Sequence, residues 1–208
     1  MITARFAVAA VLAISSLAIS LPARSAIIFA DTVIDYFNSG ANPAFPTGAY
    51  GGTFPGTFPV VVPLSHATDG LANTFISLPR GSFITLGFSG GFVFDGLGLD
   101  LFISEVGGSD ETADVFVSSD FGTTFTLLGV ATTATVSGFD LASIGFTGQV
   151  NAVKIVGLDN RGASPGFDLA FVQGLEGSVV VNRVSEPASL ALAALGIAAA
   201  AAVRRRRS

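Results

Sequence analysis

Apolar and polar residues alternate with a period of two through much of the middle of the chain. The alternation is clear in four segments, 84–88, 97–103, 113–117 and 153–155. Because successive side chains of a strand point to opposite faces, this pattern predicts strands with one buried face. Turn residues recur about every ten positions, and no interior stretch has the period of a long amphipathic helix. The pattern predicts an all-β domain, an antiparallel β-sandwich.

The composition excludes several kinds of catalytic chemistry. The chain has 208 residues, 50% of them hydrophobic and 12% charged, with no cysteine, no tryptophan and one histidine. It therefore has no disulfide framework, no cysteine nucleophile, no thiolate zinc site and no cage of several histidines. With 19 phenylalanines and no tryptophan, we expect phenylalanine to supply the large core residues.

Charge is distributed unevenly along the chain. Between Asp31 and Arg183 there are 14 acidic and four basic residues, a formal net charge of −10. Nucleic-acid binding requires a basic surface that displaces counterions, so no nucleic-acid partner is expected. An acidic middle fits an exported domain kept soluble by repulsion, or one that takes up divalent cations.

The N-terminal segment has the layout of a secretory signal peptide. Arg5 precedes an uncharged run from Phe6 to Leu21, and small residues follow. We therefore interpret residues 1–30 as a signal peptide cleaved near 23–30. Residues 31–183 are then the predicted β-sandwich domain.

Three features follow one another at the C-terminal end. They are the residues Val184, Ser185, Glu186 and Pro187, the uncharged run 188–203, and the cluster Arg204, Arg205, Arg206 and Arg207. Sixteen helical residues span about 24 Å, somewhat less than the hydrocarbon core of about 30 Å, and snorkelling arginines cover part of the difference. The positive-inside rule predicts a transmembrane helix with the arginines in the cytoplasm and the acidic domain outside. The alternative is a buried core helix with a basic tail.

This tail resembles the PEP-CTERM sorting signal of Gram-negative bacteria, with Ser185 in place of the first proline of the motif. The resemblance implies that residues 184–208 direct the protein to an exosortase-like membrane processing enzyme. It also implies an exported protein that is tethered to the inner membrane before processing. Afterwards, the protein would reach the cell surface or the extracellular matrix.

The segment 66–75, followed by 82–88, resembles the start of the discoidin and galactose-binding-like jelly rolls, and 114–120 and 167–172 align with their central hairpin and closing strand. The resemblance implies a structural calcium ion, Ca²⁺, at the Asp-Gly loop. The candidate ligands carried over are Asp69, Asn73, Thr74 and Glu176. The alternative is a plain turn in which Asp69 caps local backbone amides.

Residues 118–125 match the Asp-box pattern, in which Ser-x-Asp-x-Gly-x-Thr precedes an aromatic residue. The pattern predicts a structural turn formed by Ser118, Asp120, Gly122 and Thr124, with Gly122 at positive φ. A sialidase propeller would repeat the pattern, which we find once. We therefore expect a hairpin whose turn is fixed by local hydrogen bonds, rather than the remnant of a glycosidase.

Two groups of carboxylates raise the question of a glycoside hydrolase. The first group is Asp95, Asp100 and Glu105. Asp95 and Asp100 are five positions apart, which places them on opposite faces of a continuous strand unless a turn lies between them. The second group, Asp110, Glu111 and Asp114, follows a glycine pair, and we interpret it as solvated loop charge, with a second calcium site as the alternative.

The stretch 41–63 is rich in Pro, Gly, Phe and Thr and lacks clean alternation. It is expected to be an irregular ordered loop or edge segment, held in place by Phe45, Phe54 and Phe58. The alternative, an aromatic ligand platform, is disfavoured because phenylalanine has no polar group on its ring.

The sequence therefore predicts an exported, non-catalytic protein of the cell surface or matrix, with exopolysaccharide as the expected ligand. The alternatives are an extracellular glycan-active hydrolase and a purely structural matrix protein.

Overall fold

The computed structural model describes residues 27–108, 110–132 and 136–181. Most of the predicted signal peptide and the whole predicted tail, including residues 184–187, the run 188–203 and the arginines at 204–207, lie outside the described residues. None of the helices in the described ranges has the length and apolar character needed to cross a membrane.

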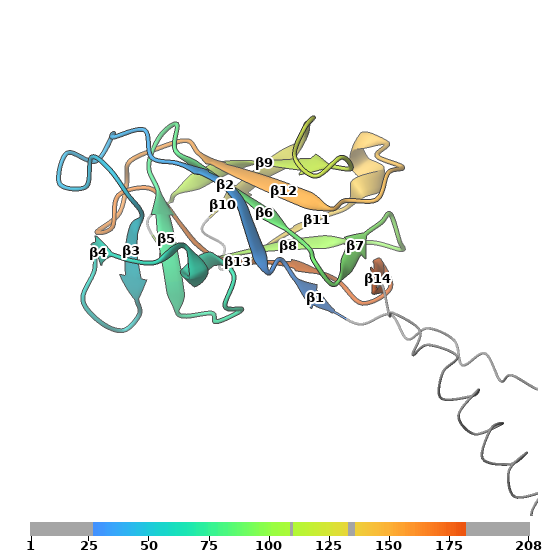
Figure 1. The fold of residues 1–208 in the computed structure, drawn as a ribbon, viewed down its shortest axis with the longest axis horizontal. Coiled ribbons are helices and arrows are strands. Elements are labelled where there is room, and N and C mark those ends of the chain that lie inside the picture. The colour runs from blue at the N-terminus through green and yellow to red at the C-terminus, as the bar shows by residue number, and fades with distance from the viewer. Residues whose placement is uncertain (1–26, 109, 133–135, 182–208) are drawn as a thin grey trace, which may run out of the picture.

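Two antiparallel sheets face each other across the core (Figure 1). In the described residues, the larger sheet has seven strands, with the path β11 (Val136–Phe139), β8 (Leu101–Glu105), β13 (Phe167–Gly174), β5 (Thr74–Leu78), β3 (Tyr50–Thr53) and β4 (Val60–Val61), and with β1 (Ile28–Phe29) beside β13. The other sheet has five, in the order β10 (Thr126–Thr132), β9 (Thr112–Ser118), β12 (Ala152–Gly157), β6 (Phe83–Gly87) and β2 (Thr32–Phe37). The predicted all-β antiparallel sandwich of jelly-roll type is confirmed.

Shorter elements complete the described chain. They are the two-stranded ladder of β14 (Val179–Val181) and β7 (Gly91–Val93), and the 3₁₀ helices η1 (Leu64–Ala67) and η2 (Leu141–Ile144).

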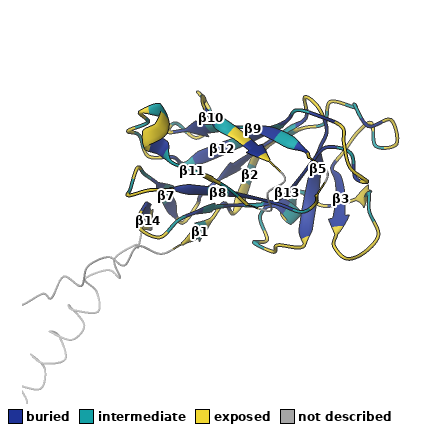
Figure 2. Cartoon of the chain, turned by 180° about the vertical axis from the view of Figure 1, so that it is seen from behind, coloured by how far each residue is buried: buried dark blue, intermediate teal, exposed yellow. Residues whose placement is uncertain are grey.

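The core of the five-stranded sheet follows from the alternation in the sequence. Ile155 of β12 lies between Ile84 of β6 and Val115 of β9 in the strand register, and all three side chains are fully buried. Burying an aliphatic side chain of this size contributes roughly 1.5–3 kcal/mol. Figure 2 shows that β5 and β8 of the other sheet are also buried.

One segment that alternates in the sequence is only partly a strand. Leu97 and Leu99 lie in the loop before β8 with exposed fractions of 104% and 47%, and the strand begins at Leu101. Gly98 has a φ of 87°, which ends any extended run at that point. The prediction of a strand over 97–103 is therefore wrong for its first half.

Phenylalanine contributes less to the core than the composition suggested. Of the phenylalanines that the structure describes, Phe75, Phe88 and Phe167 are buried core residues. Most other large core side chains are valine, isoleucine and leucine. The expectation that phenylalanine supplies the large core residues is wrong for most positions.

The stretch 41–63 contains the edge strand β4 and its neighbour β3. The Phe45 ring stacks on Tyr50 with centroids 4.8 Å apart, and the Phe58 ring meets Phe75 edge-on at 5.5 Å. The Phe54 ring is 54% exposed, and its centroid lies 6.3 Å from that of the Phe58 ring. All three phenylalanines therefore contribute to the internal contacts of this segment, as expected, and about half of Phe54 stays exposed.

The two ends of the sandwich differ in the elements that form them. β3, β4 and β5 lie at one end in Figure 1, and β7 and β14 lie at the other. The described chain begins at β1 and ends at β14, which are close to each other at this second end (Figure 1).

Candidate functional site

A pocket of about 330 Å³ opens among β5 and the loops that follow β3, β8 and β12. Its aromatic lining comes from Phe54, Phe58 and Phe75. A Cβ at Gly52 would lie 2.6 Å from the Cβ of Phe58. Glycine at that position therefore allows the β3–β4 loop to bring its aromatic rings over the strand.

The polar side chains of the pocket include Asp168 of β13. It lies opposite Ser77 of β5 in the strand register, is 5% exposed, and accepts a hydrogen bond from the Ser77 hydroxyl through Oδ1. The Ser77 and Ser164 hydroxyl oxygens are 2.6 Å apart. Ser164 lines the pocket together with Asp168, so two neighbouring strands and one loop fix this carboxyl group.

Two glutamates adjoin Asp168 and are less well satisfied. Glu105 ends β8 and Glu111 immediately precedes β9, and each is 2% exposed. When the two side chains are ionised, three of their oxygens have no hydrogen-bond partner among the described residues. They are Oε1 and Oε2 of Glu105 and Oε2 of Glu111. A Cβ at Gly107 would lie 2.6 Å from Oε1 of Glu105, so the glycine permits the chain to pass over that carboxylate. Glu111 and Gly107 both line the pocket.

Burial shifts the titration of all three acids in the same direction. It raises the pKa of Glu105 from 4.5 to about 7, against the opposing effect of a hydrogen bond with Glu111. Burial, followed by the charges of Glu105 and Asp159, raises the pKa of Glu111 to about 8. Burial also raises the pKa of Asp168 from 3.8 to about 9, which the hydrogen bond from Ser77 opposes. A hydrogen bond between two carboxyl groups requires a proton on one of them.

No basic side chain in the described ranges forms an ion pair with these acids. Arg161, in the loop after β12, donates instead from Nη1 to the carbonyl oxygen of Asp110 at 2.8 Å. Lys154 lies 3.8 Å from the centroid of the Phe83 ring. The pocket is therefore acidic and has no internal counter-charge within the described part of the chain.

The predicted calcium loop forms local hydrogen bonds. The Thr74 hydroxyl donates to both carboxylate oxygens of Asp69 at 2.9 and 2.8 Å, and a backbone amide two residues on donates to Oδ1 at 2.9 Å. The carbonyl of Asn73 accepts a hydrogen bond from the amide of Phe54 at 2.7 Å. Glu176 is exposed in the turn between β13 and β14. The structure thus brings Asp69 and Thr74 together in turn geometry, and calcium binding stays a prediction.

The segment that matches the Asp box forms a bonded turn. The Ser118 hydroxyl donates to Oδ1 of Asp120 at 2.7 Å and accepts from the amide of Gly122 at 2.9 Å. The amide and hydroxyl of Thr124 donate to the same carboxylate at 2.8 and 2.7 Å. Gly122 has a φ of 86°. Hydrogen bonds, first from the amide of Thr124, lower the pKa of Asp120 to about 2.

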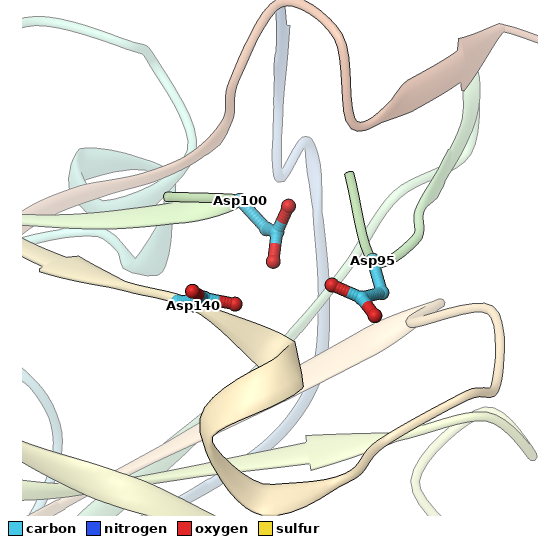
Figure 3. A group of neighbouring side chains, drawn as sticks. All are labelled: Asp95, Asp100 and Asp140. Atoms are coloured by element: carbon cyan, nitrogen blue, oxygen red, sulfur yellow. The ribbon is translucent and has the colours of Figure 1, made fainter. Parts of the chain in front are cut away.

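A second group of acidic side chains lies near the start of β8, at the end of the strand opposite to Glu105 (Figure 3). Oxygens of Asp95, Asp100 and Asp140 lie within 4.8 Å of one another, so the group could hold a metal ion. Asp100 is fully buried, and its two oxygens accept hydrogen bonds from the amides of Gly96 at 2.9 Å and Leu141 at 2.8 Å. Asp95 and Asp100 come together because the chain between them is a loop, so the opposite-face argument for a continuous strand does not apply.

Sequence reasoning missed the acidic pocket. The interpretation of Glu111 as solvated loop charge is wrong, because it is buried beneath the loop. A signal was present for Glu105, which follows Leu101 and Ile103 in the period of two and is buried as they are. No comparable pattern links Glu105 to Glu111 and Asp168, which only the fold brings together.

Comparisons with known proteins address the tail and the fold separately. The family model of the PEP-CTERM protein-sorting motif matches residues 183–207. No curated protein matches the chain significantly.

Several solved structures are similar to the described domain. The CBM32 of AlyQ, in complex with 4,5-unsaturated mannuronic acid, has 12% sequence identity and a TM-score of 0.43, over 71% of this chain and 98% of that chain. The C-terminal domain of a chitobiase from Bacteroides fragilis has 14% identity and a TM-score of 0.45, over 76% and 97%. The family 32 CBM of Clostridium perfringens NanJ, in complex with galactose, has 14% identity and a TM-score of 0.39, over 54% and 83%.

The identities and TM-scores are low, and the fold assignment rests on the strand pairings described above. The motif at residues 183–207 indicates an exported, membrane-anchored precursor. The chain is thus an all-β jelly-roll protein that carries a PEP-CTERM protein-sorting motif.

Proposed function

We propose that this protein is a non-catalytic polysaccharide-binding protein of the cell surface or extracellular matrix. An exosortase-like enzyme would process it at the motif in residues 183–207. The pocket among β5 and the loops after β3, β8 and β12 would bind the polysaccharide. The observation that carries the proposal is the combination of exposed aromatic surface and carboxyl groups in this one pocket.

The chemistry of the pocket suits a sugar. Sugar rings present apolar C–H faces together with hydroxyl groups, and small-molecule sites combine mostly apolar walls with a few fixed polar groups. Phe54 and Phe58 supply the apolar wall, and Asp168 and Glu111 supply hydrogen-bonding groups. A volume of about 330 Å³ lies at the lower end of the range for ligand sites and fits a single sugar residue of a longer chain.

The acids of the pocket support binding over hydrolysis. A glycoside hydrolase needs one carboxyl group that keeps its proton and another that is charged, and their environments push the two pKa values apart. Burial raises the pKa values of Glu105, Glu111 and Asp168 together. All three shifts favour the neutral form, and none of the three carboxyl groups has the lowered pKa that would keep a nucleophile or base charged.

A binding assay tests this proposal with the full-length protein purified in detergent. The protein is passed over immobilised native exopolysaccharide and a panel of neutral, uronic and amine-bearing glycans, and the solution is assayed for new reducing ends. We expect retention on at least one glycan and no new ends. Release of reducing ends would support the hydrolase alternative, and absence of retention across the panel would support a purely structural role.

Two variants locate the site. Phe54→Ala removes an exposed ring from the pocket, and we expect at least a tenfold loss of affinity. Phe121→Ala is the matched control, since Phe121 is 72% exposed and lines a separate pocket beside the Asp120 turn. Loss of binding in the control alone would move the site to that second pocket.

A further inference from the structure

We propose that the pocket selects a positively charged amine, so that its ligand is an amino sugar with a free, non-acetylated amino group. This inference rests on the proposed function and names the ligand class for the same pocket. Glu111 and Asp168 would meet the ammonium group directly, with Glu105 behind the 106–108 segment. The rings of Phe54 and Phe58 would face the sugar.

The first step is the shortage of hydrogen-bond donors around the acids. Three carboxyl groups at most 5% exposed lie together, and three of their oxygens have no hydrogen-bond partner among the described residues when ionised. Burying such groups without partners costs free energy, and native structures keep them mainly where they serve a function. A neutral sugar would leave these carboxyl groups protonated, whereas an ammonium group would donate to their oxygens and favour their ionised form.

The second step separates an organic cation from a metal ion. A calcium ion takes six to eight oxygen ligands at short range. Among the described residues, the acidic group whose oxygens converge within 4.8 Å is Asp95, Asp100 and Asp140, outside this pocket. Much of the remaining lining consists of Phe54, Phe58 and other apolar side chains, which provide no oxygen ligands. Aromatic faces do attract an ammonium group, through the cation–π interaction.

The third step concerns the size of the ligand. A lysine side chain of a partner protein also carries an ammonium group, but it is a thin aliphatic chain. The pocket of about 330 Å³ has room for a ring beside the amine, and the exposed Phe54 offers a flat surface to such a ring. The amino sugar therefore uses both the charge and the shape of the pocket.

The test compares two oligosaccharides of equal length that differ only in acetylation. The probes are a glucosamine tetramer and its fully N-acetylated form, titrated into the full-length protein in detergent near neutral pH. We expect the free amine to bind at least tenfold more tightly, with an affinity that falls as salt is added. Equal affinity for the two probes would overturn amine selection and leave the proposed glycan function standing. Binding of no glycan in the wider panel would overturn the proposed function itself.

Variants of the pocket test whether its acidic side chains cause the preference for the free amine. Glu111→Gln keeps the shape of the side chain and removes its charge, and we expect at least a tenfold loss of glucosamine-tetramer binding with an unchanged or higher melting temperature. Asp168→Asn is the second variant should Glu111→Gln fail to fold. Asp114→Asn is the matched control, because it removes one negative charge from a partly exposed position on β9 outside the pocket. Equal losses in the control and in the pocket variants would overturn the assignment.

Two further results would overturn the amine-sugar proposal in favour of another ligand. One is direct binding of polylysine when the glucosamine tetramer does not bind, which would identify a protein partner. The other is a rise in melting temperature with calcium alone that disappears in Glu111→Gln, which would identify a metal site.

Discussion

The two ends of β8 carry buried acids with opposite hydrogen-bonding environments. Asp100, just before the strand, is fully buried, and backbone amides at 2.9 and 2.8 Å satisfy its two oxygens. Glu105, the last residue of the strand, is 2% exposed and has no hydrogen-bond partner among the described residues as a carboxylate. Burial alone therefore does not distinguish a structural acid from a functional one. The hydrogen-bond donors around the carboxyl group do distinguish the two, because they decide whether a carboxylate is already stabilised in the folded chain.

The largest effect is expected at Asp100. Asp100→Ala removes two buried hydrogen bonds and leaves the amides of Gly96 and Leu141 without their acceptor. We expect a loss of roughly 3 kcal/mol in the free energy of unfolding, measured by denaturant titration.

Asp95→Ala is the control within the same acidic group, because Asp95 is exposed. It should leave stability nearly unchanged. A similar loss in both variants would show that the group is stabilised by a shared cation rather than by the amides around Asp100.

The next effect is the response of the pocket acids to pH. Their pKa values in the folded chain are raised, Glu111 to about 8 and Asp168 to about 9. The folded state therefore holds protons more tightly than the unfolded state, and its stability falls as pH rises from about 5 through 9. We therefore expect the melting temperature to fall as the pH is raised over that range.

Glu111→Gln should flatten this pH profile, whereas Asp114→Asn should leave it as in the parent protein. A profile that is equally steep in both variants would place the responsible groups elsewhere.

A smaller effect is expected at the Asp120 turn. Asp120→Ala removes the acceptor for the amide and hydroxyl of Thr124 and for the Ser118 hydroxyl. We expect the melting temperature to fall by a few degrees at neutral pH. The pKa of Asp120 is lowered from 3.8 to about 2 in the folded chain. Its contribution to stability is therefore present when the pH is above the ordinary aspartate pKa, and it disappears as the pH falls toward 2. The difference between variant and parent should therefore shrink in acid.

The smallest expected effect concerns calcium at the Asp69 loop. A bound ion would stabilise the folded chain, so a chelator should lower the melting temperature of the parent protein slightly and leave Asp69→Ala unaffected. If the melting temperature is the same with and without chelator in both proteins, the loop is a plain turn held by the bonds from Thr74.

Local pattern predicted the strands, and the fold created the pocket. The alternation at 113–117 and 153–155 corresponds to β9 and β12, because strand pairing and burial act on the same period of two. The same period at Leu97 and Leu99 was misleading, since no strand in the described ranges pairs with these residues and the glycine between them adopts a positive φ. Pattern alone cannot show which alternating segment finds a partner.

The pocket acids illustrate the other limit. Glu105, Glu111 and Asp168 come from the end of one strand, a loop and the start of another strand. Each has an ordinary sequence context, and their shared environment depends on pairings such as that of β13 with β5. The turn at Asp120 was easier to anticipate, because all its partners lie within a few consecutive residues.

The placement of β1 and β14 beside each other has a mechanical consequence for the exported protein (Figure 1). The sorting motif at 183–207 follows β14 in the sequence, so it is joined to the sandwich at this end. The pocket lies beside β5 and the loop after β3, and these strands are at the other end of the sandwich (Figure 1). A molecule held through the motif would therefore carry its pocket at the end of the domain that is farther from the point of attachment.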